Sequence, residues 1–166
     1  MVIAETPRLR IRHLTAADAA FTCQLLNDAD FIRNIADRGV RNEQQALQYL
    51  TDGPIKSYKQ HGYGLFLVED NASSEAMGFC GLLYRDYLRE TDIGFAFLPA
   101  YRGKGLAYEA AAAVMHYGYG QLRLKRIVGL TLAGNLPSVA ILQRLGLRFE
   151  KMVQLQPGAE FIQLYS

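Results

Sequence analysis

Residues 8–14 alternate between apolar and polar side chains, with Leu9 and Ile11 set between arginines. A period of two predicts a strand with one buried face. Compact apolar runs bounded by glycine or polar residues predict further strands. These lie over 64–70, 77–84, 92–98, 126–132, 147–155 and 160–165, with a turn over 71–75.

Other stretches show helical spacing and helix-end residues. The strongest is 106–120, where four consecutive alanines accompany apolar residues three and four positions apart. Capping residues, proline and glycine set the expected ends of the others. They run from Thr15 to about Leu26, from Asn42 to a stop at Gly53, from Pro54 to near Gly62, and from the turn holding Pro137 to a stop at Gly146. This order of elements predicts one α/β domain over residues 1–166 with a mixed sheet.

Composition narrows the class of protein. The net charge is +2, and the basic residues are spread along the chain rather than clustered. This disfavours nucleic-acid and membrane-surface roles but leaves room for a basic pocket that takes a small anion. Cys23 and Cys80 lie in apolar stretches, as buried thiols do in a reducing compartment. No signal peptide or membrane-spanning run is evident, so we expect a cytoplasmic protein.

The segment "YRGKGLA" at 101–107 carries the clearest chemistry. Glycines let a backbone approach a ligand closely, and the first turn of a helix offers unpaired N–H groups. Together with Arg102 and Lys104 they predict a phosphate site. The loop is neither a Walker A motif, since Gly105 follows the lysine, nor a dinucleotide fingerprint, since Tyr108 stands where glycine or alanine is needed. The alternative is a flexible turn with solvated charges.

Beyond the loop, the chain resembles the GNAT superfamily of N-acetyltransferases over nearly its whole length. "RGKGLA" is similar to the family's pyrophosphate loop. "TPRLRIR", "TDIGFAFLPAYRGKGLAYEA" and "NLPSVAILQRLGL" resemble segments of the branch that contains the ribosomal-protein N-terminal (serine/alanine) acetyltransferases. The resemblance implies a mixed, mostly antiparallel central sheet flanked by helices, with a V-shaped cleft between two parallel central strands.

The resemblance also implies where acetyl-CoA, the acetyl donor, binds. The coenzyme would lie in the V between 92–98 and 126–132, with its pyrophosphate on the amides of 102–107 and its pantetheine along 96–98. The amide of Phe97 would hold the thioester carbonyl, and Asn135 would bond the pantetheine arm. The implied cofactor-binding residues are Phe97, Leu98, Arg102, Gly103, Lys104, Gly105, Leu106, Ala107, Asn135 and Ser138.

Catalytic groups are less clearly marked. Many GNAT enzymes have a tyrosine acid seven residues after the asparagine, but this chain has Leu142 there. The ribosomal branch carries a serine that Ser138 matches, so the acid is Ser138 or water. An amine must lose its proton, and Asp92 or Glu90, on one face if the strand reaches that far, could accept it. Solvated carboxylates are the alternative.

Two further departures from the branch are Tyr108, where threonine is usual, and Leu147, where phenylalanine is usual. Tyr108 would alter contact with the coenzyme, and Leu147 would serve core packing. The histidines lack metal spacing, so no metal is expected.

The predicted function is acetyl transfer from acetyl-CoA to a primary amine by direct attack, with no nucleic-acid or membrane partner. The acceptor is a protein N-terminus or a small molecule, and the protein is a monomer or homodimer. One alternative is a non-catalytic acetyl-CoA sensor or interaction domain. Another is a nucleotide-binding α/β domain. Sensor and enzyme differ in turnover, because a sensor binds acetyl-CoA without releasing CoA.

Overall fold

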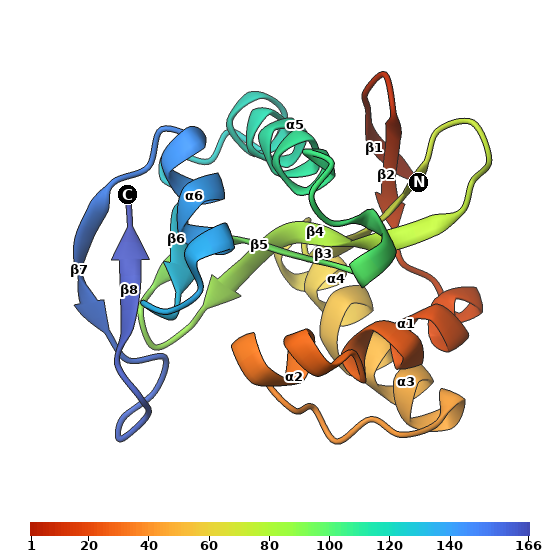
Figure 1. Cartoon of the computed structure of the whole chain (residues 1–166), viewed down its shortest axis with the longest axis horizontal. Helices are drawn as coiled ribbons and strands as arrows, with labels where there is room; N and C mark the ends of the chain where they lie inside the picture. Colours follow the sequence, from red (N-terminus) through yellow and green to blue (C-terminus); the bar gives the residue numbers. More distant parts are fainter.

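The computed structural model describes all 166 residues and contains one eight-stranded sheet (Figure 1). Its strand order is β1-β2-β3-β4-β5-β6-β8-β7, and neighbouring strands are antiparallel except β5 and β6. The strands are β1 (Val2–Glu5), β2 (Leu9–His13), β3 (Leu65–Asp70), β4 (Ala76–Arg85), β5 (Glu90–Phe97), β6 (Val128–Thr131), β7 (Phe149–Val153) and β8 (Ile162–Tyr165). The predicted mixed, mostly antiparallel sheet is confirmed.

Helices cover both faces of this sheet. The longer α5 (Leu106–Gly120) and α6 (Leu136–Arg144) lie on one face, and the helices of the first third of the chain lie on the other (Figure 1). The latter are α1 (Ala19–Leu26), preceded by a short 3-10 turn, α2 (Ala29–Asn34), α3 (Glu43–Leu50) and α4 (Lys56–His61). Each face has its own apolar core because strand side chains alternate: Ile93 and Phe97 pack with α5, while Ala96 packs with α1 and α3.

The V-shaped cleft arises where β5 and β6 separate. These parallel strands pair only at Asp92 with Val128 and at Ile93 with Gly129. Beyond those pairs β5 continues to Phe97 without a partner on that side. The backbone groups of this part of β5 that do not bond β4 are therefore open to a ligand lying between the strands, except the Phe97 carbonyl, which accepts from Arg102.

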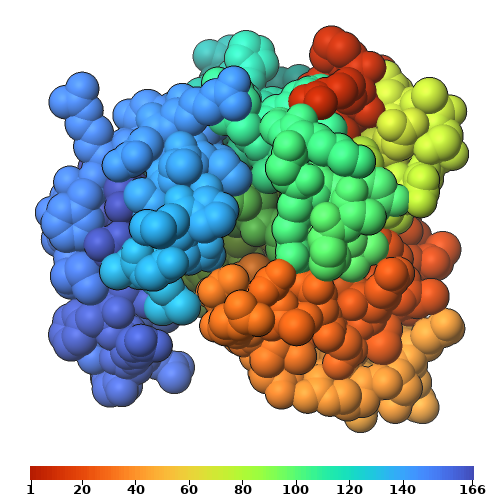
Figure 2. All heavy atoms as spheres, viewed as in Figure 1, coloured from red at the N-terminus to blue at the C-terminus, as the bar shows by residue number.

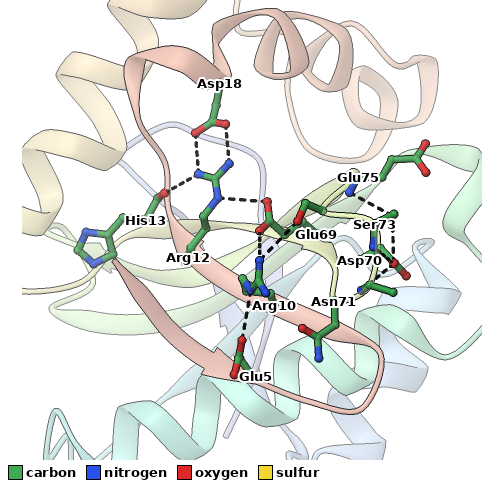
Figure 3. A network of polar contacts seen from close by, with 12 residues as sticks. Glu5, Arg10, Arg12, His13, Asp18, Glu69, Asp70, Asn71, Ser73 and Glu75 are labelled. Carbon is green, nitrogen blue, oxygen red and sulfur yellow. Dashed lines mark hydrogen bonds and ion pairs between the residues drawn. The ribbon is translucent and has the colours of Figure 1, made fainter.

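A network of arginines and carboxylates ties the sheet to the start of α1 (Figure 3). Arg12 from β2 donates to both carboxylate oxygens of Asp18, at 3.0 and 3.1 Å, and to Glu69 of β3 at 3.1 Å. Glu69 also accepts from Arg10 at 3.5 Å. Asp18 and Glu69 are buried, so these bonds satisfy carboxylates that water cannot reach.

Three local features differ from expectation. The chain does not leave the helix at Gly53: a five-residue turn of π-helix (Thr51–Ile55) joins α3 to α4, and this wider turn carries the chain past Pro54, which has no N–H. The sequence patterns also missed β1 and α2, because each is too short to show a hydrophobic period.

None of the helices has the length and apolarity needed to cross a bilayer.

Candidate active site

The loop between β5 and α5 presents three unpaired N–H groups. Gly103 and Gly105 have φ of +73° and +76°, a region in which glycine carries no steric penalty. The amides of Gly103, Lys104 and Gly105 make no hydrogen bond within the chain. The first amides of α5 follow directly, and these also lack intrahelical partners. The predicted phosphate loop therefore has its donors free.

The N-terminal hairpin holds this loop from one side. Arg8 donates to the carbonyl oxygen of Lys104 at 2.8 Å and to Glu109 of α5 at 2.6 Å. Glu109 also accepts from the hydroxyl of Thr6 at 2.6 Å. Arg8 thus fixes the backbone immediately before Gly105, which leaves the adjacent amides pointing in a set direction.

Arg102 is directed toward α2 at the other side of the loop. Its Nε donates to the carbonyl oxygen of Phe97 at 2.9 Å, and its terminal nitrogens bond Asp28, at 2.6 Å, and Asp30. The charge expected for a phosphate is therefore shared with two carboxylates. Lys104 makes no ion pair and is exposed, so it is the free cation of the loop.

A pocket of about 560 Å³ opens beside the loop, between α5, the N-terminal hairpin and the end of α6. Lys104 and Tyr108 line it, and Arg144 of α6 lies 3.9 Å from the centre of the Tyr108 ring. That stacking places a cation on an aromatic face. The pocket has the aromatic surface and the positive charge that a nucleotide requires.

The helix α6 begins at Asn135, whose side-chain oxygen accepts from the amide of Ser138 at 3.4 Å. This cap leaves the side-chain nitrogen of Asn135, Nδ2, without a partner in the chain. Both residues are half-buried. Leu142 is 1% exposed and packs on Gly129, where an added Cβ would lie 2.5 Å from a Leu142 methyl group. Position 142 therefore supplies packing and no proton.

The two predicted base residues lie on the same face of β5, opposite α5, but in different surroundings. Asp92 is 2% exposed, and its carboxylate accepts a hydrogen bond from Nε of Arg85 at 2.9 Å. Burial raises the pKa of the Asp92 carboxyl above its ordinary value, and the Arg85 guanidinium offsets part of that rise. Glu90 accepts from Arg126 at 3.1 Å, and Arg126 also bonds Glu150. Asp92 is therefore a buried, ion-paired carboxylate, and the alternative that it is a solvated side chain does not hold.

A second hollow, a recess separate from the pocket at Tyr108, lies on the surface. Figure 2 shows it between α2 (orange), the loop region (green) and the start of α6 (light blue), with β5 at its bottom. Leu106 is buried and Ala107 half-buried behind the loop. Of the predicted strand-end contacts, the Leu98 amide already donates to the carbonyl of Met77 at 3.0 Å, and the Phe97 carbonyl accepts from Arg102.

Comparison with known proteins decides the family. The model of the acetyltransferase (GNAT) domain matches residues 8–148. The chain belongs to the GNAT family of acetyltransferases. This GNAT chain is 27% identical over 146 residues to the uncharacterized N-acetyltransferase YnaD of Bacillus subtilis. The matched residues are 87% of this chain and 82% of YnaD. The predicted family is confirmed.

Solved GNAT structures superpose along the whole domain. A GNAT-family acetyltransferase from Bacillus anthracis matches with a TM-score of 0.78 at 26% identity, covering 99% of this chain and 95% of that one. RimL, described as a ribosomal L7/L12 alpha-N-protein acetyltransferase in complex with coenzyme A, matches with a TM-score of 0.85 at 16% identity, covering 99% and 96%. At that identity RimL shows the shared fold, and it places the predicted ribosomal branch among the structural neighbours.

Sequence patterns missed several residues around this site. Arg85, which pairs with Asp92, ends β4, and Arg8, which holds the loop, lies in the turn just before β2. At such positions an arginine is usually a solvated side chain. Asp28 and Asp30 belong to the unpredicted α2. One local pattern could have found them, because Asp28 caps the helix through a 3.1 Å bond from the Phe31 amide and Asp30 lies in its first turn.

Proposed function

We propose that this GNAT chain transfers the acetyl group of acetyl-CoA to a primary amine. One observation carries the proposal: three unpaired amides, at residues 103–105, stand at the start of α5, beside strands that diverge into a V. Oriented N–H groups at a helix start favour the pyrophosphate of the coenzyme. Lys104 adds a free charge, and the pocket at Tyr108 and Arg144 suits the nucleotide end.

The pantetheine arm then extends along the unpaired side of β5. Asn135 bonds the arm with its side-chain nitrogen, Nδ2, which its capping role leaves free. The main chain near Phe97 orients the thioester carbonyl. This arrangement brings the acetyl group to the vertex of the V, close to Asp92.

The reaction needs two proton movements. The neutral amine attacks the thioester carbonyl carbon, a C–N bond forms and the C–S bond breaks. The amine proton passes to Asp92, directly or through water. The CoA thiolate takes a proton from water, or from Ser138 as Ser138 takes one from water. The start of α6 also stabilises the developing thiolate charge, because helix N-termini carry partial positive charge. No metal takes part in this scheme.

The surroundings of the two carboxylates favour Asp92 over Glu90 as base. A buried carboxylate with a raised pKa accepts a proton more readily than a solvated one. Arg85 holds that carboxylate at the strand start. Glu90 is engaged with Arg126 in an exposed ion pair and remains the second candidate.

The acceptor is an amine on a protein N-terminus or on a small molecule. Support for a protein N-terminus comes from RimL, whose name describes alpha-N-protein acetylation, and from a ribosomal-protein-S5-alanine acetyltransferase from Vibrio fischeri with a TM-score of 0.79 at 18% identity. We further propose that residues 1–166 act as one catalytic domain in the cytoplasm, as a monomer or a homodimer.

An acceptor screen with thiol detection tests the proposal. Peptides with free N-terminal serine or alanine, amino acids, polyamines and aminoglycosides are each incubated with acetyl-CoA, and CoA release is measured. We expect turnover with at least one class and none without enzyme. Tight acetyl-CoA binding without turnover for any amine would favour the sensor instead. Failure to bind acetyl-CoA, with ATP or NAD raising the melting temperature, would favour the nucleotide-binding domain.

A further inference from the structure

The side chain of Arg102 joins three elements that are distant in the sequence. It donates hydrogen bonds to the carbonyl oxygen of Phe97, at the end of β5, and to the carboxylates of Asp28 and Asp30, at the start of α2. Each of its three nitrogens has one of these partners. Its own backbone begins the loop with the free amides. A shift of that loop therefore moves the guanidinium to which Asp28 and Asp30 are bonded at the start of α2.

Helix α2 has few other constraints. Of its six residues only Phe31 is buried, and Phe31 is the one α2 residue in the apolar core below the sheet. A six-residue helix is too short to be stable by itself. Beyond its short link to α1, its position therefore depends on one apolar anchor and on the bonds that Asp28 and Asp30 make to Arg102. Asp30 also pairs with Arg33 within the helix, at 3.3 Å. Asp28 is the stronger of the two partners by burial, with a side chain 11% exposed against 42% for Asp30.

The placement of α2 gives this link a consequence for the reaction. Helix α2 forms one wall of the recess, the start of α6 forms another, and β5 lies at the bottom (Figure 2). The loop that Arg102 opens forms the adjoining wall. An amine that reaches Asp92 through this recess passes α2, so the position of α2 affects how the acceptor fits.

We infer that Arg102, Asp28 and Asp30 are positioning residues that couple coenzyme binding at the loop to the acceptor wall at α2. This rests on the proposed binding of CoA at 103–107. When the loop closes on a pyrophosphate, Arg102 holds Asp28 and Asp30 in place and α2 is ordered with it. Arg102 thus acts through α2 and contributes little of the coenzyme affinity, which comes from the free amides and Lys104.

The competing scheme predicts opposite changes in the order of α2 and in the affinity for CoA. If the guanidinium itself bound the pyrophosphate, it would leave Asp28 and Asp30 when CoA arrived, and α2 would loosen. Neutralising the two aspartates would then release Arg102 and tighten CoA binding. The two schemes are therefore separable with CoA alone, before any acceptor is known.

The test uses the full chain and four variants: D28N/D30N, R102Q, their combination, and D37N. Asparagine at 28 keeps an oxygen that caps α2, so the double variant removes charge without removing the cap. D37N is the matched control, because Asp37 pairs with Arg41 in the neighbouring segment and has no contact with the loop. Calorimetry gives the Kd for CoA, and hydrogen exchange of the peptide over 28–36 is measured with and without saturating CoA.

In the parent and in D37N, we expect CoA to slow exchange over 28–36 by at least about fivefold, the low end of couplings between sites. In D28N/D30N and in R102Q this protection is lost while the Kd stays within about twofold, and the combined variant is no worse than either. Protection that survives in D28N/D30N overturns the inference, as does faster exchange with CoA or tighter CoA binding in that variant. A parent chain that does not bind CoA overturns the proposed function instead, and the inference with it.

Discussion

Gly105 shows how much of the site depends on single residues. Its φ of +76° is a conformation that residues with a Cβ adopt only at a cost. Its amide is one of the three free donors, and the adjacent carbonyl is held by Arg8. A Cβ here both strains the backbone and stands beside the surface that a pyrophosphate must approach.

Gly105→Ala therefore should weaken CoA binding at least about tenfold, a loss of about 1.4 kcal/mol. It should also lower the free energy of unfolding by about 1–2 kcal/mol, because alanine is strained at positive φ. Gly158→Ala is the control, since Gly158 has a φ of +81° and open space around it in the β7–β8 connection. Calorimetry should show normal CoA affinity for that control and a similar loss of stability. Equal CoA affinity in both variants would contradict the loop assignment.

Ser138 and Asp92 carry the proposed proton transfers. Ser138→Ala and Asp92→Asn should each lower kcat by about ten- to a thousand-fold with a smaller change in Kd for acetyl-CoA, because removing one such group from a transition state has effects of this size. Steady-state kinetics with the amine found in the screen, alongside melting temperatures, provide the measurement. If both variants lose stability but turn over normally per folded molecule, the two residues are structural.

At the scale of elements, the ion-pair network in Figure 3 fixes how the first helical layer meets the sheet. Glu69 has a side chain 6% exposed and bonds Arg12 and Arg10 from the neighbouring strand. Arg12 in turn holds Asp18, which accepts from the amide of Thr15 at 2.8 Å and so fixes the entry to α1. Strand pairing and helix entry therefore depend on the same guanidinium.

Glu69→Gln should lower the free energy of unfolding by about 1–3 kcal/mol, the range for buried hydrogen bonds to charged groups. Glu5→Gln is the matched control, because Glu5 bonds the same Arg10 but its side chain is 55% exposed. That change should cost less than about 1 kcal/mol. Urea unfolding of both variants measures the difference. Equal small losses would mean that the network contributes little to the docking of α1.

For the whole molecule, stability depends on groups far from the site. His13 is stacked on Tyr58 with ring centres 4.0 Å apart, and its Nε2 is buried without a partner. Burial lowers the pKa of His13 below its ordinary value of 6.5. In the unfolded chain the ring is solvated and takes up a proton near that ordinary value, so the two states differ in bound protons at mildly acidic pH.

The sign of the effect follows from that difference. Well above pH 6.5 His13 is neutral in both states, so it adds no pH dependence there. Below that value the unfolded state binds the proton first, and stability falls as the pH is lowered until the folded pKa is passed. His13→Phe keeps a ring on Tyr58 and removes the titration. Urea unfolding at about pH 7 and about pH 5 should show a smaller loss in the variant than in the parent. Identical losses in the two proteins would exclude His13 as a source.

The local elements and the loop were predictable from the residues alone. Alternation marked β2, and compact apolar runs marked the other predicted strands. Alanines and caps marked α5 and α6, and glycine beside basic residues marked 102–107. These signals are local, because φ preferences and the apolar period depend on a few neighbouring residues. Short elements escaped, since β1 and α2 span too few residues to show a period.

Which side chains meet depends on the packed fold. The partners of Arg102 lie 72 and 74 residues away, and Asp92 became a buried carboxylate because β4 brings Arg85 against it. Leu142 was fixed as packing by the bare backbone of Gly129 beneath it. Such contacts depend on strand order and on which face each element covers. These are properties of the packed whole, and local preferences do not contain them.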